Sequence, residues 1–152
     1  MIRFDSVSKR YGGGGEALSG VNFTLAGGEM AFLTGHSGAG KSTLLKLLMV
    51  MERPSLGAVL VNGHNVGRLA ARQIPYYRRQ LGVVFQDHQL LTDRSVFDNV
   101  ALPLQVSGER TSEVAKRVRA ALAAVGLSGY ESKRPLSLSG GEQQRVGIAR
   151  AV

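Results

Sequence analysis

The sequence contains no cysteine. It therefore cannot form a disulfide framework, a thiolate metal site or a cysteine nucleophile, which is compatible with a reducing compartment. Its three histidines, His36, His64 and His88, do not have the spacing of metal ligands.

Long apolar runs are also missing. The longest, from Leu44 to Met51, is interrupted by Lys46 and falls short of the about 20 apolar residues that cross a bilayer. The first five residues alternate apolar and polar side chains, unlike a secretory signal. We expect that the chain is not exported and that any membrane association goes through a partner.

Acidic residues are scarce, with 11 Asp and Glu against 19 Lys and Arg and a net charge of +8. The basic residues are dispersed, and the small groups at 78–79 and 116–119 have no aromatic interleaving. This pattern favours phosphate ligands and a solvated basic surface, so we expect no nucleic-acid partner. A chain of 152 residues with 43% hydrophobic residues suffices for one domain, 1–152.

The most informative segment is GHSGAGKST at 35–43, which fits the phosphate-loop pattern G-x-x-x-x-G-K-[ST]. Residues 30–34 before it are typical of a short buried strand, and residues 42–49 after it are rich in helix formers. This strand, loop and helix context distinguishes a functional phosphate loop from a chance match. The predicted phosphate-binding residues are Gly35, His36, Ser37, Gly38, Ala39, Gly40, Lys41, Ser42 and Thr43.

Each residue type in the loop has a chemical reason. Glycines allow successive amide N–H groups to turn inward around phosphate oxygens, and the following helix adds the positive end of its dipole. Lys41 would supply a charge for the outer phosphates, and Ser42 a hydroxyl for Mg²⁺. A tight turn before a core helix would explain the glycines but not the Lys41-Ser42 pair.

The rest of the chain predicts an α/β fold. Near period-two alternation predicts two half-buried strands before the phosphate loop, joined by the glycines at 12–15 as an antiparallel edge. A strand at 58–63 closed by an Asn-Gly turn, a short helix at 74–80 and a buried strand at 81–85 follow. The pattern at 111–125 predicts an amphipathic helix that stops at Gly126.

Three other positions are candidates for nucleotide contact. Gln86 follows the predicted strand at 81–85, where open α/β sheets place ligands, although a loop glutamine that caps backbone groups is as plausible. For Tyr11, the residues alone favour an ordinary, partly buried aromatic side chain over a nucleotide contact. Ser139-Gly140-Gly141 precedes a helix-like segment, so it is either a second phosphate-binding helix start or a simple serine cap.

Together these elements resemble the nucleotide-binding subunits of ABC transporters over essentially the whole chain. The resemblance implies a P-loop NTPase-type, mostly parallel sheet core, an amino-terminal antiparallel β edge and a helical signature subdomain at about 87–145. It also implies that Tyr11 stacks on adenine and that Gln86 touches Mg²⁺ and the attacking water. Residues 138–143, LSGGEQ, are similar to the LSGGQ-type signature of this family.

The family mechanism that this resemblance implies is ATP hydrolysis in a head-to-tail homodimer. One copy would hold MgATP, with Lys41 and Gln86 in catalytic roles and Ser42 and Gln86 near the metal. The other copy would contact this ATP through its signature residues. These are Ser139, Gly140, Gly141, Glu142 and Gln143.

A narrower resemblance, carried by His36 and Asp87-His88, is to the members of this family that act in bacterial cell division. It implies an integral membrane partner of the FtsX type, further division proteins and a peripheral location on the cytoplasmic face of the inner membrane. Relatives that power lipoprotein release or macrolide export share much of the segment at 98–103. A nucleotide-gated binding module without turnover is a third hypothesis.

In the family, the helix after the signature is followed by an apolar strand that ends in a Mg²⁺-binding Asp and a catalytic Glu. This sequence ends at Val152, within that helix. The resemblance therefore implies a truncated ABC ATPase fold, an amino-terminal fragment. Because phosphoryl transfer depends on an oriented nucleophile, we expect these residues alone to hydrolyse ATP poorly or not at all.

Overall fold

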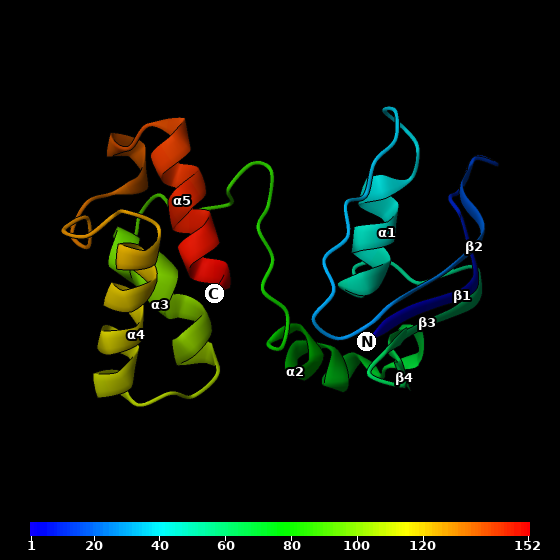
Figure 1. Ribbon diagram of the computed structural model, residues 1–152, viewed down its shortest axis with the longest axis horizontal. Helices are drawn as coiled ribbons and strands as arrows, with labels where there is room; N and C mark the ends of the chain where they lie inside the picture. The colour runs from blue at the N-terminus through cyan, green and yellow to red at the C-terminus, as the bar shows by residue number, and fades with distance from the viewer. The chain divides into compact units, whose positions relative to one another are not determined.

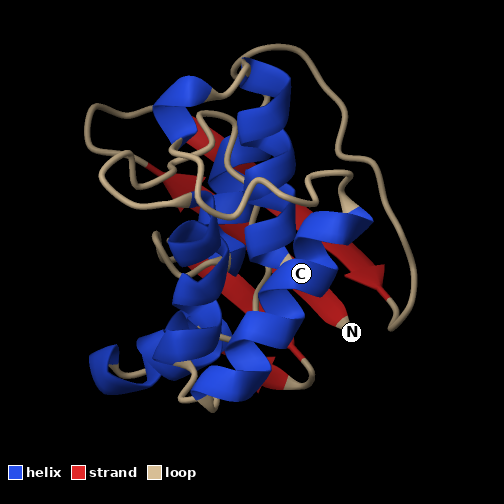
Figure 2. Cartoon of the chain, turned by 90° about the vertical axis from the view of Figure 1, so that its left-hand side faces the viewer, coloured by secondary structure: helices blue, strands red, loops and turns tan.

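The computed structural model describes residues 1–152 as two compact units, Met1–Arg78 and Arg79–Val152 (Figure 1). The first unit contains all the strands and the helix that follows the phosphate loop, and the second is built from helices and loops. Figure 2 distinguishes the strands, helices and loops of the chain by colour. None of the helices combines the length and the apolar character needed to cross a membrane. The predicted helical subdomain at about 87–145 stays a prediction.

The sheet of the first unit has the order β2-β1-β3-β4. Its strands are β1 (Ile2–Arg10), β2 (Glu16–Leu25), β3 (Leu56–Val61) and β4 (His64–Asn65), and every pair is antiparallel. Phe4 of β1 lies opposite Phe23 of β2 and Val59 of β3, and the two phenyl rings stack with centroids 4.6 Å apart. This confirms the predicted antiparallel edge and the glycine-rich link.

The helix α1 (Lys41–Leu48) packs its buried residues Leu44 and Leu47 on this sheet. The 3₁₀ turns η1 (Val66–Arg68) and η2 (Ala71–Gln73) lead into α2 (Ile74–Arg78), the predicted short helix. The Tyr77 hydroxyl donates to the carbonyl oxygen of Leu48 at 2.7 Å. The Arg78 guanidinium donates to the carbonyl oxygens of Met49 and Val50, so α2 holds the carboxyl end of α1.

The turn between β3 and β4 is formed by Asn62 and Gly63, as predicted. Both have positive φ, 48° and 81°, as a two-residue hairpin turn requires. The Asn62 side chain also accepts a hydrogen bond from the amino terminus of Met1 at 2.8 Å. The turn therefore links the amino end of β1 to the carboxyl end of β3.

The predicted α/β class is confirmed, but the strands predicted at 30–34 and 81–85 are wrong for this structure, and its sheet is antiparallel where a mostly parallel one was predicted. Neither segment enters a ladder, and Phe32 is 83% and Val84 46% exposed. A strand exists only where neighbouring strands satisfy its backbone groups, and the sheet consists of β1 to β4 alone.

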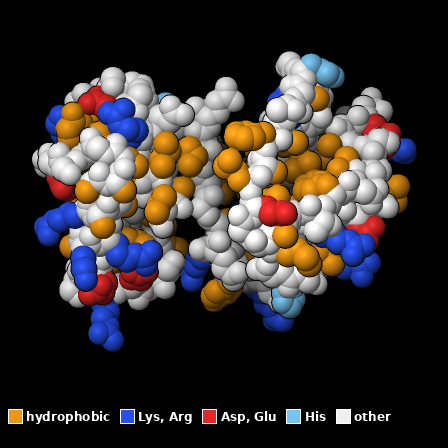
Figure 3. All heavy atoms as spheres, in the orientation of Figure 1, with side chains coloured by type: hydrophobic (Ala, Val, Ile, Leu, Met, Phe, Trp, Pro, Cys, Tyr) orange, Lys and Arg blue, Asp and Glu red, His pale blue; other side chains and the backbone are white.

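On the face of the molecule that Figure 3 shows, apolar side chains gather in groups, whereas Lys and Arg side chains are scattered.

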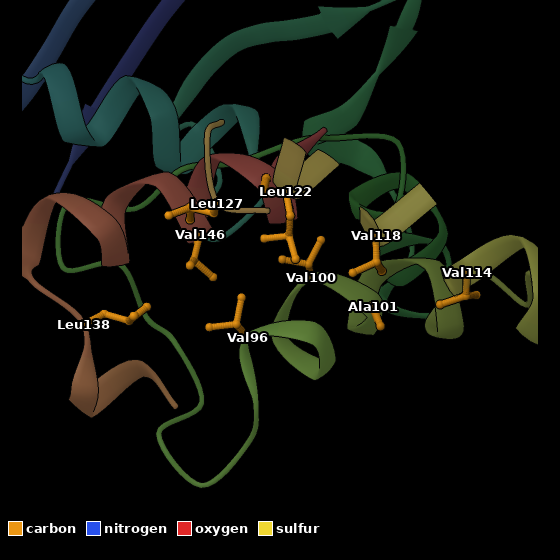
Figure 4. Close-up of a cluster of buried hydrophobic side chains, with 10 residues drawn as sticks. Val96, Val100, Ala101, Val114, Val118, Leu122, Leu127, Leu138 and Val146 are labelled. Carbon is orange, nitrogen blue, oxygen red and sulfur yellow. The ribbon is translucent and has the colours of Figure 1, made fainter. Parts of the chain in front are cut away.

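The second unit consists of α3 (Val96–Val106), α4 (Thr111–Ala124), the 3₁₀ turn η3 (Pro135–Ser137) and α5 (Gly140–Ala151). Figure 4 shows its buried core, which includes Val100 of α3, Val118 and Leu122 of α4 and Val146 of α5. The predicted stripe of α4 therefore packs inward. Gly126 has a φ of 72° just past its end, the conformation that stops a helix at glycine.

Candidate functional site

The phosphate loop lies in the first unit and leads directly into α1. Gly35, Gly38 and Gly40 have φ values of 150°, 81° and 84°, conformations that a side chain disfavours. The first bond within the helix runs from the amide of Leu44 to the carbonyl oxygen of Gly40 at 2.9 Å. The amides of residues 41–43 therefore have no acceptor in the helix and can donate to an anion.

Gly40 fixes the loop against the sheet. A methyl group on its Cα would overlap the carbonyl oxygen of Ala17 and lie 2.7 Å from Cδ2 of Leu18, both in β2. Around Gly38, by contrast, no atom lies within 4 Å of that position. The loop is thus held by close backbone approach at one end and is open at its middle.

Lys41 supplies the charge of the loop. Its Nζ donates to the carbonyl oxygens of Gly35 at 2.6 Å and His36 at 2.7 Å, which holds the ammonium group over the loop. An ammonium group has three hydrogens, so one donor remains for a phosphate oxygen. With no acidic residue in the first turn of α1, this end of the helix favours an anion.

The donors of the loop fit a nucleotide phosphate chain, and they also indicate how Mg²⁺ would be held. No group of three or more His, Cys, Asp or Glu side chains could hold a metal ion by itself. A Mg²⁺ ion would therefore take oxygens from the phosphates and from the exposed Ser42, in the first turn of α1. Its chemistry there would be to neutralise charge on the phosphates.

Tyr11 lies in the same unit as the loop, just after β1. Its backbone amide donates to the carbonyl oxygen of Gly15 at 3.2 Å, which closes the glycine-rich turn. Tyr11 is 38% exposed, and the ammonium group of Lys9 lies 5.0 Å from its ring centroid. The exposed aromatic surface is available to a planar ligand, and its predicted contact with adenine stays a prediction.

Gln86 lies in the second unit, in a turn closed by a bond from the amide of His88 to the carbonyl oxygen of Phe85. Its side chain is exposed. His88 and Gln89 follow with φ values of 58° and 44°, a left-handed conformation that is unfavourable for residues with a Cβ. The turn is therefore strained, and other residues must hold it.

Two residues that the sequence did not single out hold this segment. The Arg150 guanidinium, near the end of α5, donates to the carbonyl oxygens of His88 at 2.8 Å and Gln89 at 2.7 Å. The buried Asn99 of α3 exchanges hydrogen bonds with the backbone of Leu91. An asparagine inside an apolar helical stripe could have indicated a buried polar contact from the sequence alone. An arginine near a helix end is too common to indicate a specific contact.

We expect Arg150→Met to loosen the strained turn. It removes two charge-assisted hydrogen bonds, each worth about 1.5–3 kcal/mol. The amides of His88 and Gln89 should then exchange hydrogen at least about tenfold faster, measured by NMR. The control is Arg145→Met, an exposed position on the same helix. Equal exchange rates in both variants would contradict the role of Arg150.

The signature segment begins α5 with a capping box. The Ser139 hydroxyl accepts from the amide of Glu142 at 3.3 Å, and Oε2 of Glu142 accepts from the amide and hydroxyl of Ser139, both at 2.8 Å. Gly140 and Gly141 are exposed at the positive end of this helix. The serine cap is therefore present, and the predicted contacts of residues 139–143 with a partner's ATP stay predictions.

Tyr130 adds a third donor to the same carboxylate. Its hydroxyl donates to Oε1 of Glu142 at 2.9 Å, and Lys133 lies 3.5 Å from the centroid of the tyrosine ring. The amide of Ser139, its hydroxyl and the Tyr130 hydroxyl, in decreasing order, lower the pKa of Glu142 from 4.5 to about 2. Both carboxylate oxygens are thus engaged within the chain.

This arrangement predicts a pH dependence at the start of α5. Because the pKa of Glu142 is lowered on folding, the cap is fully stabilising above its ordinary value of 4.5 and is lost as pH falls toward about 2. A carboxyl carbon titration by NMR should place the midpoint near the lower value. Ser139→Ala should raise this midpoint more than Tyr130→Phe; a midpoint that neither variant moves would contradict the assignment.

The comparisons with known proteins agree with this geometry. A family model described as "ABC transporter" matches residues 18–152. The cell division ATP-binding protein FtsE of Escherichia coli K12 is 59% identical over 152 residues, which are the whole of this chain and 68% of that relative. The methionine import ATP-binding protein MetN 1 of Pseudomonas putida is 47% identical over 156 residues, covering all of this chain and 47% of that relative.

Among solved structures, the dimeric MJ0796, a bacterial ABC transporter cassette, has a TM-score of 0.92 and 34% identity, covering 100% of this chain and 69% of that chain. A post-hydrolysis state of the same cassette, bound to ADP and Pi, also has a TM-score of 0.92. The fold and the sequence therefore point to one family along the whole length. This chain belongs to the ABC transporter family.

Proposed function

We propose that the chain is the ATP-binding subunit of a complex that couples ATP binding and hydrolysis to bacterial cell division. The observation that carries the proposal is the loop at 35–43, with its left-handed glycines, its unpaired amides and the ammonium group of Lys41. The 59% identity to FtsE supports the division role over methionine import, where the identity is 47%.

In this proposal, MgATP lies between two copies of the chain arranged head to tail. Tyr11 of one copy stacks on adenine, its phosphate loop holds the triphosphate with Mg²⁺ near Ser42, and Gln86 orients the attacking water. Ser139, Gly140 and Gly141 of the other copy bring a second helix amino terminus to the γ-phosphate. Donors that converge on the transferred group from both copies stabilise its charge in the transition state.

The electrostatics of the signature support the proposed dimer. The exposed N–H groups of Gly140 and Gly141 at the start of α5 can donate to a bound γ-phosphate, beside the Glu142 carboxylate that caps the same turn. ATP binding therefore favours the closed dimer, and loss of the γ-phosphate reopens it. The dimeric MJ0796 cassettes, one of which holds ADP and Pi, support this arrangement.

The membrane connection is part of the same proposal. An integral membrane partner of the FtsX type would hold the subunit at the cytoplasmic face of the inner membrane and would respond to dimer closure. Other division proteins would join this complex.

Calorimetry with MgATP, MgADP and MgAMP tests the nucleotide site. We expect affinity to fall sharply when the outer phosphates are absent, because Lys41 and the helix amides act on them. Equal affinity for MgATP and MgAMP would contradict the site.

Capture of membrane proteins from bacterial membranes in the presence of MgATP tests the partner. We expect an FtsX-type protein in the captured fraction. Recovery of a lipoprotein-release or drug-export permease instead would favour a transport role.

A further inference from the structure

Lys9 occupies an unusual position for a strand lysine. Its side chain is only 12% exposed, and its Nζ donates to Oε2 of Glu52 and to the carbonyl oxygen of Arg53 at 2.8 and 2.9 Å. Glu52 and Arg53 follow the carboxyl end of α1, the helix whose first residues close the phosphate loop. These two acceptors hold the partly buried ammonium group in one place.

The same ammonium group lies over the ring of Tyr11, 5.0 Å from its centroid. A cation at this distance is attracted to the negative face of an aromatic ring. It also draws electron density from the ring, so a second aromatic system meets less repulsion on the opposite face. One face of the Tyr11 ring is thus occupied, and the residue remains 38% exposed.

We propose that Lys9 is a positioning residue for nucleotide binding, which fixes Tyr11 through its ring and prepares it to stack on a purine base. This inference rests on the proposed ATP-binding function. Lys9 connects the Tyr11 ring, on which the base would stack, to the residues after the end of α1, and α1 begins at the phosphate loop. The base site and the phosphate site are therefore held by one helix and its flanking residues.

Calorimetry with two ligands tests the role of Lys9. MgATP carries a base, and magnesium tripolyphosphate carries the same phosphates without one. Lys9→Met should weaken MgATP binding by about threefold to tenfold, as expected for a lost cation–π contact and a looser ring. It should leave tripolyphosphate binding within about twofold. Lys46→Met, which removes the same charge from an exposed position of α1, should change neither.

A double-mutant cycle with Tyr11→Leu separates the ring effect from a general effect on the fold. Lys9→Met should have no further effect on MgATP binding once the ring is gone. Glu52→Gln, which removes the ion pair but keeps the cation, should retain most of the affinity, and Lys9→Arg should recover part of it.

Three results would overturn this inference alone. The first is an unchanged MgATP affinity in Lys9→Met, and the second is an equal loss for MgATP and tripolyphosphate in that variant. The third is equal binding of tripolyphosphate and MgATP by the wild-type chain, because Tyr11 would then not hold a base although the phosphate site stood. Binding of neither ligand by the wild-type chain would overturn the proposed function with it.

Discussion

Replacing Lys41 by methionine is expected to weaken MgATP binding by roughly 100-fold, or about 3 kcal/mol. The ammonium group is held over the loop by the carbonyl oxygens of Gly35 and His36. Its loss removes the only side-chain charge of the loop and a charge-assisted hydrogen bond to the phosphates. Methionine keeps an unbranched stem of similar length, so the change in charge is isolated.

The measurement is calorimetry with MgATP, accompanied by thermal unfolding to show that the fold is retained. The matched control is Lys46→Met, which removes an equal charge from an exposed position of the same helix. Its affinity should stay within about twofold of wild type, since an exposed charge away from the ligand is largely screened. Equal losses in the two variants would mean that net charge, and not the position of Lys41, governs binding.

Gly40→Ala is expected to abolish MgATP binding and to destabilise the first unit. The residue has a φ of 84°, and a methyl group there would overlap the Ala17 carbonyl oxygen and press on Leu18. A left-handed conformation at a residue with a Cβ costs about 1–2 kcal/mol by itself. The overlap adds to this, because β2 cannot move without breaking its pairing with β1. The loop must therefore move, and its amides lose their common direction.

Gly38→Ala is the control for this substitution. Its φ is 81°, yet no atom lies near the position that the methyl group would take. Its free energy of unfolding should fall only by the conformational cost of about 1–2 kcal/mol, whereas that of Gly40→Ala should fall clearly more. Chemical unfolding followed by circular dichroism measures the unfolding free energy of each variant. Equal unfolding free energies would show that the contact with β2 does not constrain the loop.

The predictions that were confirmed depend on local patterns. The β1–β2 hairpin follows from alternation around a glycine run, the Asn62-Gly63 turn from two residues that tolerate positive φ, and α4 from its apolar stripe. Each pattern and its consequence lie within a few residues of each other. The sequence therefore contained the information needed for these elements.

The strands predicted at 30–34 and 81–85 show the limit of that reasoning. Their apolar residues are typical of buried strands, but a strand needs partners that lie elsewhere in the chain, and here neither segment pairs. No local sequence pattern shows whether the strands that would pair with such a segment lie beside it.

The sequence by itself determined the chemistry of the phosphate loop, because glycine conformation, helix dipole and lysine charge are properties of adjacent residues. Only the tertiary structure decided what surrounds the candidate sites. Lys9 meets Glu52 across 43 positions, and Arg150 meets Gln89 across 61. Those contacts result from chain packing, and packing brings together residues whose distance along the sequence carries no signal.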